Sequence, residues 1–257
     1  MTLAATAVPK PLFERSIELL LELCSVSSAS GDTEGLYRMT ELLSRELTPL
    51  GLVTDVSAEP GVNGVAQPVL TARDPGACDR HILLLGHLDT VLPAVPPHVE
   101  NGRLVGTGAL DMKGGLAAFI GALLLLRECG ETPPDDLLFA AVPDEEIGGP
   151  VSVRTVRHLG ERAHTVLVLE PGARVDGGET LVTGRRGLTV WRLDARGRAA
   201  HSGVAYWVGH SALAAAAAWA SRVQKMSEQK NGPVVNAGRI VGGDSEFVSD
   251  VGEEHRF

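Results

Sequence analysis

Apolar side chains in the first part of the chain recur every three or four positions. Between residues 13 and 24 this spacing predicts an amphipathic helix, and Pro9 and Pro11 stand at its entry, where proline is tolerated. A second helix is expected to bury apolar positions between residues 36 and 47. Asp32 lies just ahead of it and is a suitable N-cap residue.

Short, continuous apolar runs follow, and helical patterns alternate with them. Three runs have the composition of strands that are covered on both faces, namely His81–Leu85, Leu137–Val142 and Thr165–Leu169. A further strand, Val65–Ala72, contains Pro68, which favours an edge position because proline cannot donate a ladder hydrogen bond. Helices are expected at Lys113–Arg127 and Val151–Leu159. This alternation predicts an α/β fold with a mainly parallel central sheet flanked by helices.

The pattern changes after about residue 182. Leu188–Ala195 alternates as a half-exposed strand does, Ser211–Val223 is an Ala-rich helical segment, and Val234–Val241 has the composition of another strand. Strand, helix and strand in this order predict a smaller α+β unit. We therefore expect two domains, residues 1–182 and residues 183–257.

Composition restricts the choice of partners and compartment. The net charge of −9 argues against nucleic acid or an anionic membrane as the main partner. The N-terminus lacks the basic region of a secretory signal, and the longest apolar run, Gly115–Leu126, is shorter than the ~20 residues that span a bilayer. Three scattered cysteines indicate reduced thiols, with Cys24 placed for core packing. A soluble, cytoplasmic protein is expected.

Polar side chains follow the three predicted buried strands or precede a helix. They are His87, Asp89, Asp111, Glu145, Glu146 and Glu170. Because ligands bind at the carboxyl ends of the strands in open α/β sheets, these side chains should converge at one rim. Imidazole together with carboxylates suits zinc or a similar divalent ion, and the absence of cysteine from the set favours an open catalytic site over a closed structural one.

Spacing suggests different roles within this set. His87 and Asp89 face the same side of an extended segment, so Asp89 can orient a metal-bound His87. Glu145 and Glu146 are adjacent and diverge, so one can bind metal while the other accepts a proton from an activated water. Asp111 lies among glycines, and one carboxylate can bridge two ions about 3.5–4 Å apart. Taken alone, each motif could instead be an ordinary polar surface pair or turn.

Five motifs in order carry a resemblance to a known family. GHLDT, GTGALDMKGG, PDEEIGG and LEPG resemble the zinc-dependent family of glutamate carboxypeptidase, acetylornithine deacetylase, succinyl-diaminopimelate desuccinylase and aminoacylase. GRAAHSG resembles the start of the lid, or dimerisation, domain of that family. The match extends from about residue 10 to residue 243, which covers most of the chain.

The resemblance implies a hydrolase that cleaves an amide bond to release an amino acid, of the carboxypeptidase or N-acyl-amino-acid deacylase type, through a water that bridges two zinc ions. One zinc would take His87 and Glu170, the other Glu146, and Asp111 would bridge them. Glu145 would be the general base. Co²⁺ or Mn²⁺ could replace zinc.

The lid domain has its own implied roles. His201 would help to hold the substrate carbonyl, and full-length relatives would form a homodimer through this domain. The substrate would be an N-acyl amino acid or a short peptide. The family often has a cis peptide after the bridging aspartate, here Asp111–Met112.

The chain departs from the family in its last part. A fifth ligand, a histidine late in a longer chain, has no counterpart, because His255 lies in the wrong element. A C-terminally truncated member is therefore expected, with an apolar sheet edge and face left exposed. Two alternatives stay open: a catalytically impaired fragment with an incomplete metal site, and a di-zinc aminopeptidase. Zinc-dependent turnover of N-acyl amino acids separates the first from an active enzyme, and a comparison of blocked with free N-termini tests the second.

Overall fold

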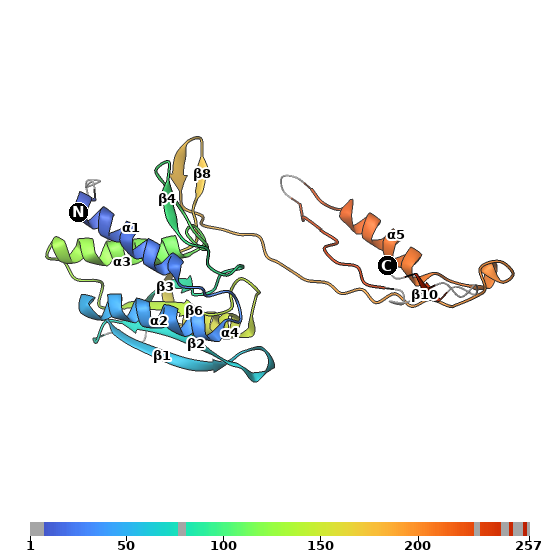
Figure 1. Cartoon of the computed structure of the whole chain (residues 1–257), viewed down its shortest axis with the longest axis horizontal. Helices are drawn as coiled ribbons and strands as arrows, with labels where there is room; N and C mark the ends of the chain where they lie inside the picture. The colour runs from blue at the N-terminus through green and yellow to red at the C-terminus, as the bar shows by residue number, and fades with distance from the viewer. Residues whose placement is uncertain (1–7, 77–80, 229–231, 243–246, 249–253, 256–257) are drawn as a thin grey trace. The chain divides into compact units, whose positions relative to one another are not determined.

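The protein is described by a computed structural model that covers residues 8–76, 81–228, 232–242, 247–248 and 254–255. The chain divides into two compact units, residues 1–183 and residues 184–257, and each is described by itself (Figure 1).

Four helices form in the first unit, and their starts follow from local chemistry. They are α1 (Lys10–Ser25), α2 (Thr33–Leu47), α3 (Lys113–Glu128) and α4 (Pro150–Gly160). Proline occupies the first turn of α1 and of α4, where a missing N–H costs nothing. The side chain of Asp32 caps α2 by accepting a hydrogen bond from the backbone N–H of Gly35 at 3.0 Å. All four predicted helices are therefore present.

A five-stranded sheet forms the centre of this unit. Its strands are β1 (Val53–Pro60), β2 (Ala66–Arg73), β3 (His81–His87), β6 (Leu137–Val142) and β7 (Ala163–Val168), in the order β1-β2-β6-β3-β7. β3 runs parallel to both of its neighbours, β6 and β7, while β1 and β2 add an antiparallel hairpin. The predicted α/β class, with a mainly parallel central sheet flanked by helices, is confirmed.

Helices cover both faces of the sheet. α1, α2 and α3 bury their apolar side chains against one face, which includes Leu70 of β2 and Phe139 of β6. α4 contacts β3, β6 and β7, and its valines line a cavity with Leu85 and Val142. Since neighbouring side chains along a strand point to opposite faces, Phe139 and Val142 belong to different layers. Figure 1 shows α1 and α3 side by side, and the two helices are in contact.

Small elements complete the described chain. The short 3-10 helices are η1 (Thr48–Leu50), η2 (Val62–Gly64) and η3 (Tyr206–Val208). The two-residue and three-residue strands are β4 (His98–Glu100), β5 (Arg103–Val105), β8 (Ala173–Val175), β9 (Gly178–Thr180), β10 (Phe247–Val248) and β11 (Glu254–His255). These strands pair as three antiparallel hairpins outside the central sheet.

Two strands differ from the sequence prediction. β2 lies between β1 and β6, so the edge position expected from Pro68 is wrong for the strand. The hydrogen-bonded ladder between β2 and β6 begins only at Leu70, however, so Pro68 does not have to donate a backbone hydrogen bond to β6. β7 was expected to be buried, yet Val166, Leu167 and Val168 are 46%, 51% and 53% exposed. In the described chain β7 pairs with β3 alone, which leaves its other edge uncovered.

The second unit contains one long helix, α5 (Ala212–Gln224), where the sequence predicts it. The Ser211 hydroxyl caps it by accepting a hydrogen bond from the backbone N–H of Ala214. No regular strand forms at Leu188–Ala195 or Val234–Val241, because neither segment has a hydrogen-bonded partner strand among the described residues. An alternating pattern predicts a strand only where a second strand can pair with it.

Two further expectations concern thiols and membranes. Cys24 is fully buried, as its helical position predicts, Cys129 is exposed, and both are free thiols, whereas Cys78 lies outside the described residues. Among the helices that are described, none combines the length and the apolar character that a bilayer crossing requires. The cytoplasmic location stays a prediction.

Candidate metal centre

Three parallel strands bring the predicted metal ligands to one rim of the sheet. His87 ends β3, Glu145 and Glu146 follow β6, and Glu170 follows β7. Asp111 lies just before α3, and the peptide bond that joins it to Met112 is cis. Because parallel strands end at the same edge, side chains more than twenty residues apart in sequence meet here.

His87 is the centre of the group. Its Nε2 lies 3.1 Å from an Asp111 carboxylate oxygen and 3.5 Å from a Glu170 carboxylate oxygen. Its Nδ1 lies 2.9 Å from the backbone oxygen of Asp89 and 3.4 Å from an Asp89 carboxylate oxygen. A carbonyl oxygen can only accept, so Nδ1 carries the hydrogen in this contact and Nε2 is the atom that can bind a metal.

Asp89 is buried below this ring and holds several groups at once. Its carboxylate accepts hydrogen bonds from the Ser30 hydroxyl at 2.7 Å and from the backbone N–H groups of Glu145 at 3.1 Å and Glu146 at 3.2 Å. One carboxylate therefore connects the end of β3 to the acidic loop after β6. The predicted contact with His87 exists, but the nearest acceptor of Nδ1 is the Asp89 backbone oxygen, since the carboxylate faces these other donors.

Asp144 fixes the other end of the acidic loop. It is fully buried, and its carboxylate accepts hydrogen bonds from the backbone N–H groups of Val151 at 3.1 Å and Ser152 at 2.7 Å, in the first turn of α4. A helix N-terminus leaves these donors without intrahelical partners, so Asp144 satisfies them. The loop that carries Glu145 and Glu146 is thus held by two buried carboxylates, those of Asp89 and Asp144. Sequence reasoning noted the acidic motif but assigned no role to Asp144.

The charges of the cluster favour a cation. Burial disfavours the imidazolium of His87, but the hydrogen bond and charge of Asp89, with the charges of Asp111 and Glu170, outweigh it and raise the pKa of His87 to about 9. Burial and the Asp111 charge raise the pKa of Glu146 and of Glu170. Carboxylates this close repel each other, and a positive charge at their centre relieves the repulsion.

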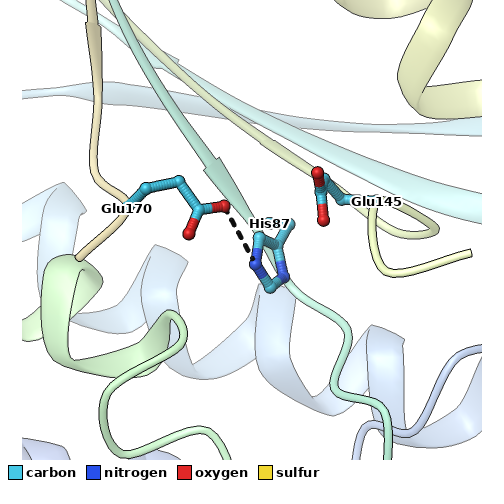
Figure 2. A group of neighbouring side chains, drawn as sticks. All are labelled: His87, Glu145 and Glu170. Carbon is cyan, nitrogen blue, oxygen red and sulfur yellow. Dashed lines mark ion pairs between the residues drawn. The ribbon is translucent and has the colours of Figure 1, made fainter. Parts of the chain in front are cut away.

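The donor atoms fit a divalent metal. Two triads, His87–Glu145–Glu170 and His87–Asp111–Glu146, each offer ligand atoms that lie within 4.8 Å of one another. Figure 2 shows the ring of His87 between the carboxylates of Glu170 and Glu145. Nitrogen and oxygen donors of this kind suit zinc and its neighbours in the first transition row. The four predicted metal ligands and Glu145, the predicted general base, are therefore brought together.

A cavity of about 600 Å³ adjoins the cluster. His87, Glu145 and Glu170 line it together with Ser152 and Arg157, and apolar side chains from β3, β6, β7 and α4 contribute much of the remaining wall. Such a combination of apolar walls with a few convergent polar groups is typical of small-molecule sites.

Two further histidines of the sequence analysis, His201 and His255, belong to the second unit. His201 belongs to the second unit, where its Nδ1 accepts hydrogen bonds from the backbone N–H groups of Gly203 at 3.0 Å and Val204 at 3.2 Å. His255 lies in β11, and the structure does not describe its side chain. Ser30, by contrast, contacts the site although nothing in its sequence context marks it, because its role depends on folding next to Asp89.

Comparison with known proteins gives a consistent family match. Residues 83–252 match the model of peptidase family M20/M25/M40. Carboxypeptidase G2 from Pseudomonas sp. (strain RS-16) is 28% identical over 234 residues, which cover 87% of this chain and 55% of that protein. Succinyl-diaminopimelate desuccinylase from Delftia acidovorans is 32% identical over 203 residues, which cover 73% of this chain and 51% of that protein. The chain thus spans about half the length of these curated relatives.

A solved structure agrees with the fold. The aminopeptidase PepT from Bacillus cereus has a TM-score of 0.63 and 25% sequence identity to this protein. The alignment covers 90% of this chain and 62% of that one.

Proposed function

Since the chain belongs to peptidase family M20/M25/M40, we propose that it provides the metal-binding part of a hydrolase that cleaves an amide bond and releases an amino acid. The carboxypeptidase and desuccinylase names of its relatives support a carboxypeptidase or N-acyl-amino-acid deacylase type, with a short peptide or an N-acyl amino acid as substrate. The single observation that carries the proposal is the convergence of five side chains, from four separate segments of the chain, at one rim of the sheet.

The proposed ligands are His87 and Glu170 for one zinc ion and Glu146 for a second, with Asp111 shared between them. Bound zinc would polarise the scissile carbonyl and acidify a water. Co²⁺ and Mn²⁺ accept the same donors. The two ligand triads share His87 and together contain all four proposed ligands, which supports a common metal site.

Glu145 is the proposed general base. It is exposed on the rim and lines the cavity with His87 and Glu170, so a substrate in that cavity would be within its reach. Its backbone N–H is held by Asp89, which keeps the side chain at the mouth of the site. From this place Glu145 can take a proton from the attacking water and deliver it to the leaving amine.

His201 is proposed to bind the substrate carbonyl. Two backbone N–H groups donate to its Nδ1, so that nitrogen has no hydrogen in this arrangement and Nε2 carries it. An Nε2–H group is a suitable donor to a carbonyl oxygen. A homodimer through residues 184–257 is proposed for full-length relatives, in line with the lid resemblance.

Turnover of N-acyl amino acids with added zinc tests the function. Glu145→Gln should keep zinc binding and lose about 10²–10⁴-fold in kcat, the usual contribution of a positioned acid–base group. Glu161→Gln, an exposed glutamate at the end of α4, is the matched control and should keep full turnover. A zinc-loaded wild-type chain without turnover would support the alternative of an impaired fragment, and an active Glu145→Gln variant would exclude this base.

An aminopeptidase is the second candidate, favoured by the structural similarity to PepT. Aminopeptidases recognise a free α-amine, whereas a deacylase accepts a blocked one. Matched peptides with free and acetylated N-termini therefore separate the two, because preference for the free amine would favour the aminopeptidase.

A further inference from the structure

The connector between α1 and α2 contains no proposed metal ligand, yet it lies against the metal site. We define the connector as residues 26–30. Thr90 donates its N–H to the Ser28 carbonyl, and Ser30 donates its N–H to the Thr90 carbonyl, both at 3.0 Å. A parallel bridge between Ala29 and Thr90 results. The connector therefore runs beside the chain that leaves β3, next to Asp89.

Ser30 reaches the carboxylate that organises the site. Its hydroxyl donates to one Asp89 oxygen at 2.7 Å, the same oxygen that accepts the N–H of Glu146. Asp89 can hold the acidic loop in place only while its own carboxylate is oriented. Ser30 is the side-chain donor that orients it from the connector, and the backbone groups of Glu145 and Glu146 do so from the loop.

Lys113 also contacts the connector. It is the first residue of α3, two positions after Asp111, and it is 1% exposed. Its ammonium group donates to the Val26 carbonyl at 2.8 Å. Val26 is the C-cap residue of α1, and carbonyl groups at a helix C-terminus carry partial negative charge, so they suit a buried cation.

The loop before Asp111 is shaped around this lysine. Gly108 has φ of +74°, and a Cβ atom there would lie 3.1 Å from Cδ of Lys113 and 2.8 Å from Cγ2 of Thr90. A side chain at this position would push the loop away from both residues. The lysine stem, the glycine loop and Thr90 are therefore closely packed, and Asp111 lies directly after that loop.

We propose that Ser30 and Lys113 are positioning residues of the metal site, which tie the Asp89 carboxylate and the chain carrying Asp111 to one shared piece of backbone, residues 26–30. This proposal rests on the proposed function, because it gives the connector a role only if His87, Asp111 and Glu146 bind metal. Neither residue touches metal or substrate. Both act by fixing the positions of the ligand side chains.

The test compares zinc affinity and the visible absorption spectrum of the Co²⁺-loaded protein in variants of the full chain. Ser30→Ala and Lys113→Met should each lower metal affinity by about tenfold or more, as expected when a group that supports a ligand is lost. Each should also shift the Co²⁺ bands, which report ligand geometry. Ser30→Thr keeps the hydroxyl and should restore both properties.

Ser28→Ala is the matched control, because it alters a buried serine of the same connector. Its hydroxyl has no hydrogen-bond partner among the described residues, so its removal should leave affinity and spectrum unchanged. Thermal unfolding of the metal-free variants separates misfolding from a local effect.

The outcomes are distinct. Wild-type affinity and an unshifted spectrum in either Ser30→Ala or Lys113→Met would overturn the shared positioning role, while the proposed function would stand. A variant whose metal-free form is destabilised enough to account for its whole loss of zinc affinity would also overturn the positioning role. A wild-type chain that binds no metal would overturn the proposed function and this proposal with it.

Discussion

At the residue scale, the protonation state of His87 links metal binding to pH. The pKa of its imidazole is raised from 6.5 to about 9, because the surrounding acids outweigh burial. The metal-free site therefore holds a proton at neutral pH that an unfolded chain would mostly have lost. This contribution to stability is fully present below pH 6.5 and is lost as the pH rises through 9.

We predict that zinc binding at pH 7.5 releases about one proton, since a metal-bound imidazole must be deprotonated at Nε2. Calorimetric titrations in buffers with different ionisation enthalpies measure this number directly. His98→Asn removes an exposed histidine on β4 and should leave the proton count unchanged. Zinc binding without proton release would show that His87 is not a ligand of the metal.

At the element scale, the close approach of α3 to the end of β7 places Glu170. A Cβ atom on Gly115 would lie 1.9 Å from the backbone oxygen of Leu169, the residue before Glu170. Glycine is required there because the helix and the strand end touch through their backbones.

Gly115→Ala should therefore lower the free energy of unfolding by about 1–3 kcal/mol, the usual range for overpacking, and should weaken zinc binding by moving Glu170. Gly160→Ala, in the last turn of α4, is the control. Nothing lies within 4 Å of a Cβ atom there, so it should be neutral or stabilising by up to about 1 kcal/mol. Urea unfolding curves of both variants decide the matter, and equal midpoints would contradict the argument.

The outer edge of β7 is a second feature at this scale. Three consecutive apolar residues, Val166–Val168, are about half exposed at an edge that no described strand pairs with, an arrangement that favours edge-to-edge association. We predict concentration-dependent self-association of the chain. Leu167→Lys should suppress it in sedimentation velocity, whereas Val99→Lys, on the exposed strand β4, should not. Equal association by both variants would rule out this edge.

At the scale of the whole molecule, the two units should respond differently to metal. All five residues of the cluster, His87 included, lie in residues 1–183, whereas α5 in the second unit has no buried residue in the described structure. A ligand that binds the folded state alone stabilises it, by about 2.7 kcal/mol at a concentration one hundred times Kd.

Zinc should therefore slow amide hydrogen exchange in β3, β6 and the start of α3, and leave exchange in α5 unchanged. Removal of zinc by a chelator should reverse the protection. Mass spectrometry of exchanged peptides measures both. Zinc-dependent protection of α5 as strong as that of β3 would show that the second unit takes part in metal binding.

Local patterns in the sequence were enough to predict the long helices and the residues of the candidate site. Hydrophobic periodicity located α1, α2, α3, α4 and α5, because the apolar face of a helix repeats within a few residues. Position at the end of a predicted parallel strand, or for Asp111 just before a helix, identified His87, Asp111, Glu145, Glu146 and Glu170, because parallel strands end at a common rim.

Tertiary structure decided what depends on contacts between distant segments. β7 has the composition of a buried strand but is exposed, and β2 contains a proline but is internal. Burial and pairing depend on the neighbouring elements and not only on the composition of the strand. Ser30 and Lys113 could not be found from the sequence, since their partners lie 59 and 87 positions away. The sequence by itself determined which donors surround His87, and only the folded chain determined what holds them there.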